Sequence, residues 1–256
     1  MRAGRQRLRI AVGASALVST VALVCAGVAR ALAPPPASEP TFPAQPGIVR
    51  GTVRLVGAPP SPSPPRPSRD PRCPAAPEER VLVDKNGNLR NALIRVLGAP
   101  ATAPPPEPLL LTQEQCAVHP RVGSLVTGQA LLMRNADPFL HNVHVYANYS
   151  TLLNQAQLPG GPDVEYRGHQ SNTLLRILCD VHPSTVAWVW VQPNALTAVT
   201  DGNGAFTIRG VPSGSWEVEA WHERFGVKKG RVVVTPDHPA ELRFDYHPTD
   251  YARYPY

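Results

Sequence analysis

Three residues far apart in the chain carry side chains that bind soft metal ions, namely His141, Cys179 and His182. One thiolate and two imidazoles suit copper in both oxidation states, because a nearly trigonal set needs little rearrangement when an electron is gained or lost. Cys179 and His182 are three residues apart, and a tight loop between two strands lets both converge on one ion. His141 has to arrive from a distant strand. The pattern therefore predicts one mononuclear copper site whose geometry is set by the fold.

The segments around these residues contain two motifs. The run His-Asn-Val that starts at His141, with Asn135 before it, and the Cys-x-x-His run from Cys179 to His182 resemble the ligand motifs of the bacterial cupredoxins, the plastocyanin and azurin type. The resemblance is specific only at these two motifs. It implies that the two histidines and the cysteine are copper ligands and that Asn142 braces the ligand loop.

One expected ligand of that family is missing. Plastocyanins carry an axial methionine a few residues after the second histidine, whereas this chain has Ser184 and Thr185 there. Neither Met1 nor Met133 fits the position, which leaves Thr185 at the axial place. A site without a thioether holds copper through three ligands, binds it more weakly, takes an oxygen ligand or has lost it, and the sequence leaves these alternatives open.

The first 31 residues are typical of an export signal. They are rich in arginine up to Arg9, apolar from residue 10 to 29, and end in the small-x-small run Ala29-Arg30-Ala31. An uncleaved membrane anchor is the alternative, because the apolar run is about long enough to span a bilayer. A lipoprotein site at Cys25 is disfavoured by the bulk of Val24. Each alternative places the rest of the chain outside the cytoplasm, in the periplasm or the extracellular space.

The positive charge of the chain is confined to this leader. The formal net charge is +6, but five of the 25 basic residues lie in residues 1–31, where there is no acidic residue. The other 20 basic residues nearly balance the 19 acidic ones. We therefore expect no nucleic-acid partner and membrane contact only through the N-terminal segment.

Three cysteines remain when Cys25 is set aside, namely Cys73, Cys116 and Cys179. Thiols outside the cytoplasm usually pair, and an odd number leaves one over. We expect a disulfide between Cys73 and Cys116. Cys179 is then an inert buried thiol in one interpretation and a metal ligand in the other.

The last part of the chain carries a second resemblance. The segment from Thr200 to Val218 follows the pattern Thr-Asp-x-x-Gly-x-Phe, Val-Pro-x-Gly and aromatic-x-Val. It resembles the carboxypeptidase regulatory-like, or transthyretin-like, β-sandwich family over about fifty residues. The resemblance implies a scaffold or docking role and supplies no catalytic residue.

Apolar residues after the leader recur with a period of two, and no long window has a period of 3.6. The chain is therefore expected to be all-β after an N-terminal apolar signal or anchor helix. With the two resemblances, the expected order is a Greek-key cupredoxin-like barrel or sandwich and then a small transthyretin-like β-sandwich. The expected boundaries are a leader at 1–31, a Pro/Ala-rich linker at 32–46, a cupredoxin-like domain at 47–192, a carboxypeptidase regulatory-like sandwich at 193–246 and a tail at 247–256.

Three classes of function fit these features. The first is an exported copper-binding protein for electron transfer or copper handling, with a redox protein or a cell-envelope component as partner. The second is a non-catalytic envelope module with a degenerate metal site, and the third is an accessory protein of the polysaccharide, rhamnogalacturonan lyase-like type. We do not expect an enzyme, because the sequence has no nucleophile elbow and no phosphate-binding glycine loop.

Overall fold

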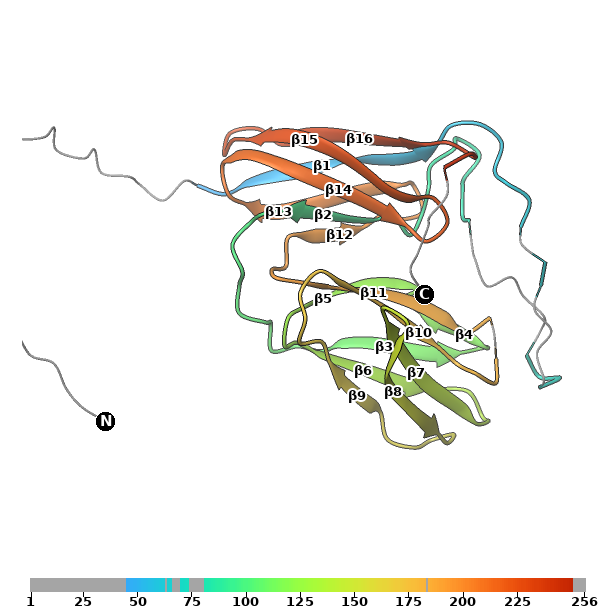
Figure 1. Cartoon of the computed structure of the whole chain (residues 1–256). Coiled ribbons are helices and arrows are strands. Elements are labelled where there is room, and N and C mark those ends of the chain that lie inside the picture. Colours follow the sequence, from blue (N-terminus) through green and yellow to red (C-terminus); the bar gives the residue numbers. More distant parts are fainter. Residues whose placement is uncertain (1–44, 63, 66–69, 74–80, 183, 251–256) are drawn as a thin grey trace, which may run out of the picture. The chain divides into compact units, whose positions relative to one another are not determined.

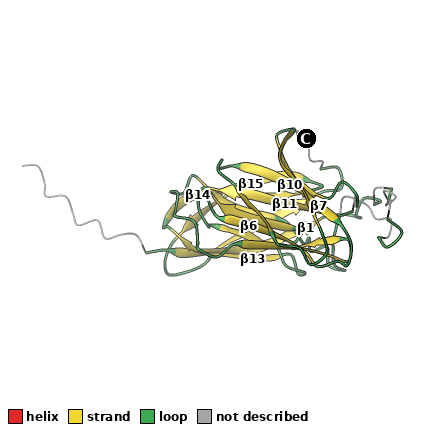
Figure 2. Cartoon of the chain, turned by 90° about the horizontal axis from the view of Figure 1, so that it is seen from below, coloured by secondary structure: helices red, strands yellow, loops and turns green. Residues whose placement is uncertain are grey.

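A computed structural model of the chain describes residues 45–62, 64–65, 70–73, 81–182 and 184–250. In this part the chain forms sixteen β-strands and no helix (Figure 2), which confirms the predicted all-β class. None of the described residues belongs to a helix that is long and apolar enough to cross a membrane. The predicted leader, most of the predicted linker and the end of the predicted tail lie outside the described residues.

The first β-sandwich is formed by two sheets from the middle of the chain. The larger sheet has the order β5-β11-β10-β7-β8, and the smaller has the order β4-β3-β6-β9. β10 buries Thr173, Leu175 and Ile177 and leaves the residues between them half-buried, which is the pattern of a strand with one face on a core. The strands are β3 (Leu109–Glu114), β4 (Ala117–His119), β5 (Val122–Val126), β6 (Ala130–Asn135), β7 (His141–Ala147), β8 (Ser150–Gln157), β9 (Val164–Arg167), β10 (Thr173–Leu178) and β11 (Val186–Gln192).

The second β-sandwich is formed by the sheets β13-β1-β16 and β12-β2-β14-β15. Its core is a separate buried cluster that includes Val53, Ile94, Phe206 and Phe244. The hydroxyl of buried Tyr246 lies 2.9 and 3.0 Å from two backbone carbonyl oxygens of this sandwich, which share its one proton. The strands are β1 (Gly47–Leu55), β2 (Leu93–Leu97), β12 (Thr197–Val199), β13 (Ala205–Val211), β14 (Gly214–His222), β15 (Gly226–Val234) and β16 (Ala240–Tyr246).

The sheets that β1 and β2 join do not fit the predicted domain boundary at residue 193. β1 pairs with β13 and, in parallel, with β16, while β2 lies between β12 and β14. In Figure 1 the blue strand β1 accordingly lies among orange and red strands. These strands do not join the sheets that carry the middle of the chain, so the predicted 47–192 unit has to be corrected. The first sandwich is an insertion between β2 and β12 of the second.

A buried cluster joins residues of the two sandwiches. The ring of Trp221, at the end of β14, packs edge-on against Trp188 and Trp190 of β11, with centroids 5.8 and 6.2 Å apart. Beside them the carboxylate of Glu223 accepts hydrogen bonds from Nε and Nη2 of Arg121, both at 2.6 Å, and from Nε1 of Trp188 at 3.2 Å. Arg121 precedes β5 and Glu223 follows β14, so this ion pair links both sandwiches away from solvent.

His222 makes the stability of the fold depend on pH. Its side chain is fully buried, and burial together with the positive charge of Arg121 lowers its pKa to about 3 from 6.5. The unfolded chain therefore binds a proton below about pH 6.5 that the folded chain does not bind. The free energy of unfolding is therefore highest above this pH and decreases as the pH falls toward 3. At pH 5 the loss that His222 causes is about 2 kcal/mol.

Urea unfolding at a series of pH values measures this loss. His222→Asn removes the titrating ring, and we expect it to flatten the decline of the free energy of unfolding between pH 6.5 and 5. His238→Asn changes an exposed histidine and serves as the matched control, which keeps the wild-type slope. An unchanged slope in His222→Asn would assign the pH dependence to other groups.

Candidate metal centre

The pairing of two strands brings the predicted ligands together. His141 is the first residue of β7, and Cys179 directly follows the last residue of β10. These strands are antiparallel neighbours with Leu178 opposite His144. The start of β7 and the end of β10 therefore lie side by side at the same end of the sheet. His182 lies in the loop between β10 and β11. This loop is closed by hydrogen bonds from Cys179 N–H to the carbonyl of Thr185 and from Thr185 N–H to the carbonyl of His182.

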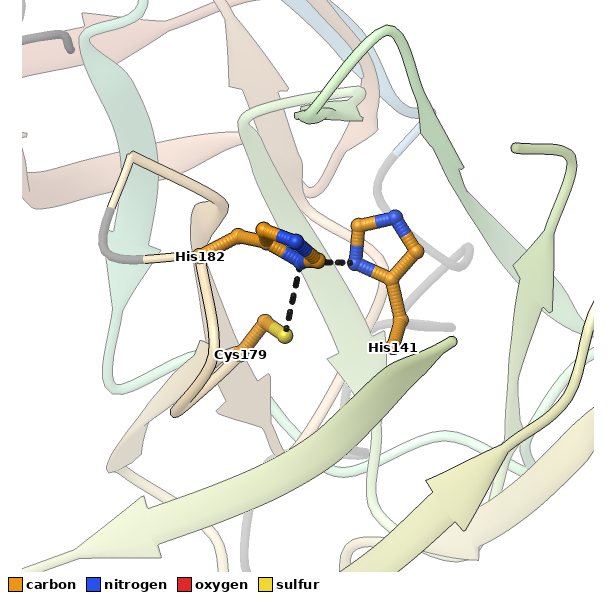
Figure 3. A group of neighbouring side chains, drawn as sticks. All are labelled: His141, Cys179 and His182. Atoms are coloured by element: carbon orange, nitrogen blue, oxygen red, sulfur yellow. Dashed lines mark hydrogen bonds between the residues drawn. The ribbon is translucent and has the colours of Figure 1, made fainter. Parts of the chain in front are cut away.

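The three side chains converge on one point (Figure 3). Nδ1 of His182 lies 3.1 Å from Nδ1 of His141 and 3.5 Å from the sulfur of Cys179. All three candidate ligand atoms lie within 4.8 Å of one another, and each residue is at most 1% exposed. The structure thus assembles the predicted set from two strand ends and one loop.

These distances fit a single metal ion. Bonds of about 2.0 to 2.3 Å to imidazole nitrogen and thiolate sulfur place the ligand atoms of one ion about 3 to 4 Å apart. A set of two histidines and one cysteine is the donor set of mononuclear copper sites that exchange electrons. The residues present therefore fit copper.

Asp137 fixes the orientation of His141. Its Oδ2 lies 2.9 Å from Nε2 of the ring, so a proton on Nε2 is donated to the carboxylate and Nδ1 keeps a free electron pair. Burial, followed by repulsion from His182, lowers the pKa of His141 despite this carboxylate. The ring is therefore neutral and able to act as a ligand at neutral pH.

Asp137 also holds the hairpin between β3 and β4. It accepts hydrogen bonds from the N–H groups of Gln115 (2.7 Å) and Cys116 (3.0 Å), two residues with positive φ. Burial acts to raise the pKa of Asp137, but these hydrogen bonds and that of His141 lower it overall. The carboxylate thus remains charged and ties His141 to the hairpin.

Cys179 is a buried thiol whose surroundings favour the thiolate only in part. Burial raises its pKa, whereas the backbone N–H groups of Asn142, Val181 and His182 oppose this rise. The N–H of Asn142 lies 3.4 Å from the sulfur. A metal ion would supply the remaining stabilisation, because a coordinating thiol is deprotonated.

The side chain of Asn142 braces the ligand loop as the resemblance implied. Its Oδ1 accepts a hydrogen bond from the N–H of Asp180 at 2.7 Å, and its Nδ2 donates to the carboxylate of Asp180 at 2.7 Å. His144 lies on the same face of β7 as Asn142, opposite to the face of His141, and its ring bonds to the carboxylate of Asp180 and to the hydroxyl of Thr151. His144 is therefore a packing residue of the loop and lies away from the ligand set.

The expected Cys73–Cys116 disulfide is present, and Cys179 is the free cysteine among those described. The hydroxyls of Ser184 and Thr185 donate hydrogen bonds to the carbonyl of Cys116 at 3.3 and 3.0 Å. Thr185, which the sequence led us to expect at the axial place, thus directs its hydroxyl proton to the disulfide hairpin, and its side chain carries no thioether.

Three residues of the site were not predicted from the sequence. Asp137 contacts His141, the ring of Phe139 lies 5.2 and 5.4 Å from the rings of the two histidines, and Asp70 faces His182. A carboxylate four residues before a ligand histidine was a usable signal for Asp137. Asp70 had no such signal, because it belongs to a distant proline-rich segment.

No model of a known protein family matches the chain, and no curated protein matches it. Solved structures that resemble part of it include a purple cupredoxin from Nitrosopumilus maritimus, at 19% identity and a TM-score of 0.30, over 33% of this chain and 99% of that one. A mutant amicyanin in its reduced state matches at 14% identity and 0.30, over 40% and 99%. A copper-containing nitrite reductase from Thermus scotoductus SA-01 matches at 17% and 0.29, over 38% and 25%. TM-scores this low do not establish a common fold, and the copper assignment is made from the geometry of the side chains.

Proposed function

We propose that this chain is a copper-binding protein with one mononuclear site formed by His141, Cys179 and His182. The observation that carries the proposal is the buried convergence of Nδ1, Sγ and Nδ1 within 4.8 Å from separate parts of the chain. Bound copper would supply a one-electron couple between Cu(I) and Cu(II). The chain holds the three ligand atoms in place in a buried site, which suits electron transfer or copper handling.

The wider setting belongs to the same proposal. The middle sandwich is proposed to be of the cupredoxin type and the other to be transthyretin-like, acting as a scaffold. With an export signal at residues 1–31, the protein would work outside the cytoplasm, either free or anchored by this segment. Its partner would be a redox protein or a component of the cell envelope, and it would have no catalytic activity.

A second candidate is a non-metal envelope module. The observation in its favour is the side chain of Thr185, which lacks a thioether and is hydrogen-bonded to Cys116. Loss of a soft axial contact weakens the hold on Cu(I), and such a site can degenerate while the fold persists.

Copper titration of the purified full chain separates the two candidates. We expect one equivalent of copper per chain and a visible thiolate-to-copper absorption band in the Cu(II) form. A chain that retains its fold by circular dichroism but takes up less than a stoichiometric amount of copper, without this band, would support the second candidate.

A further inference from the structure

A short segment, Asp70–Cys73, lies against the metal centre although it belongs to neither sheet of the first sandwich. Oδ2 of Asp70 is 3.6 Å from Nε2 of His182. His182 has no exposed surface, and its Nε2 is buried. The ring edge that faces away from the ligand cluster therefore faces the carboxylate of Asp70, and its Nε2 has no hydrogen-bond partner among the described residues.

Arg72 fixes the position of that carboxylate. Its Nε donates to Oδ1 of Asp70 at 2.8 Å, its Nη2 donates to Oδ2, and its backbone N–H donates to Oδ1 at 2.9 Å. These hydrogen bonds hold the pKa of Asp70 well below its usual range. The guanidinium also lies 4.2 Å above the ring of Phe139, which packs against both ligand histidines.

The disulfide ties this segment to the other half of the centre. Cys73 is bonded to Cys116, whose N–H donates to Asp137, and Asp137 binds Nε2 of His141. Covalent and hydrogen bonds thus run from Asp70 to the carboxylate that orients the first histidine. Each imidazole turns Nδ1 toward the cluster and Nε2 toward a carboxylate. The carboxylate oxygen is hydrogen-bonded at 2.9 Å in His141 and lies at 3.6 Å, beyond hydrogen-bond distance, in His182.

We propose that Asp70 is a positioning residue for His182, held in place by Arg72 and by the Cys73–Cys116 disulfide. The proposal rests on the copper-binding function and names a residue outside the sandwich that tunes it. A carboxylate on the far nitrogen of a ligand histidine fixes its tautomer and raises its basicity. Because this negative charge stabilises Cu(II) more than Cu(I), Asp70 lowers the reduction potential of the site.

The test compares Asp70→Asn with the wild-type full chain. Asparagine keeps the size and an accepting oxygen but removes the charge. We expect Cu(II) affinity, measured by competition with a chelator, to fall about tenfold, with a smaller fall for Cu(I) and hence a higher reduction potential. Nitrogen NMR of the metal-free chain should show His182 shifting from one tautomer to a mixture.

Asp163→Asn is the matched control. Asp163 forms the same kind of two-point pair, with Arg134 at 3.0 and 2.8 Å, on the opposite sheet of the sandwich, and it contacts neither ligand histidine. It should leave both affinities and the His182 tautomer at wild-type values.

The outcomes distinguish the two proposals. Wild-type copper binding with no change in the potential or tautomer of Asp70→Asn overturns the role of Asp70 and leaves the copper function standing. A wild-type chain that binds no copper overturns the function, and the tautomer in the metal-free chain then decides the positioning role. If Asp70→Asn and Asp163→Asn change the copper affinity and the potential equally, the cause is the loss of one negative charge anywhere on the protein. This result also overturns the proposal.

Discussion

Cys179→Ser is expected to abolish the thiolate-to-copper absorption and to weaken copper binding by more than the roughly 10- to 100-fold loss typical of changing an outer partner of a ligand. The sulfur is the one soft donor of the cluster, and a hydroxyl remains protonated where a thiol gives up its proton to the metal. The visible spectrum and a chelator competition measure both effects.

The same substitution should leave the fold intact. Cys179 is 1% exposed, and serine is nearly the same size, with the N–H of Asn142 available to its oxygen. Burying a hydroxyl in place of a thiol costs about 1–3 kcal/mol of the free energy of unfolding, which urea denaturation of the metal-free chain measures.

Met133→Leu is the control for this experiment, because Met133 supplies another buried sulfur in the same sandwich. We expect it to retain the absorption band and the affinity of the wild type. If Cys179→Ser keeps a normal copper spectrum, the ligand set is wrong. If Met133→Leu loses the copper absorption band, the thioether of Met133 takes part in the site.

Glu223→Ala should lower the free energy of unfolding by about 3–5 kcal/mol, because it leaves the guanidinium of Arg121 buried without its carboxylate. Both side chains are at most 8% exposed, and the two oxygens of Glu223 accept one bond each from Arg121 at 2.6 Å. Trp188 Nε1 loses an acceptor as well. Urea unfolding followed by tryptophan fluorescence reports the change.

The double variant Arg121→Met/Glu223→Leu separates charge from packing. Replacing a buried ion pair by apolar residues of similar volume is often close to neutral, so we expect the double variant to be more stable than Glu223→Ala. A cost below about 1 kcal/mol for the single variant would mean that water reaches Arg121 after the change.

The sequence predicted the site better than it predicted the arrangement of the domains. Ligand types and spacing indicated His141, Cys179 and His182, because a Cys-x-x-His loop and a strand-end histidine are local features. The apolar period of two that predicted strands after the leader includes Val49, Val53 and Leu55, and all three are buried in β1. It carried no information about which sheet the strand joins, since any core accepts the same period.

The side chains that contact the ligand histidines could not be predicted from the sequence, for a similar reason. Asp70 and Phe139 act through contacts with the two histidines that only the folded chain creates. Residue type at these positions has an ordinary explanation in a loop, so nothing local distinguishes them. Residues near a metal centre are thus predicted when they belong to the sequence motif. They are missed when only the folding of the chain brings them close to the ligands.

The parallel pairing of β1 with β16 has a consequence for the order in which the molecule is assembled. Val49 lies opposite Ala240, so the host sandwich cannot close until β16, the last described strand, has been made. The inserted sandwich has all of its strands much earlier in synthesis. Long-range pairings of this kind form slowly, and an early β1 without its neighbours has two open edges. A nascent chain is therefore expected to complete the inserted sandwich, which holds the candidate metal centre, before β1 can pair with β16.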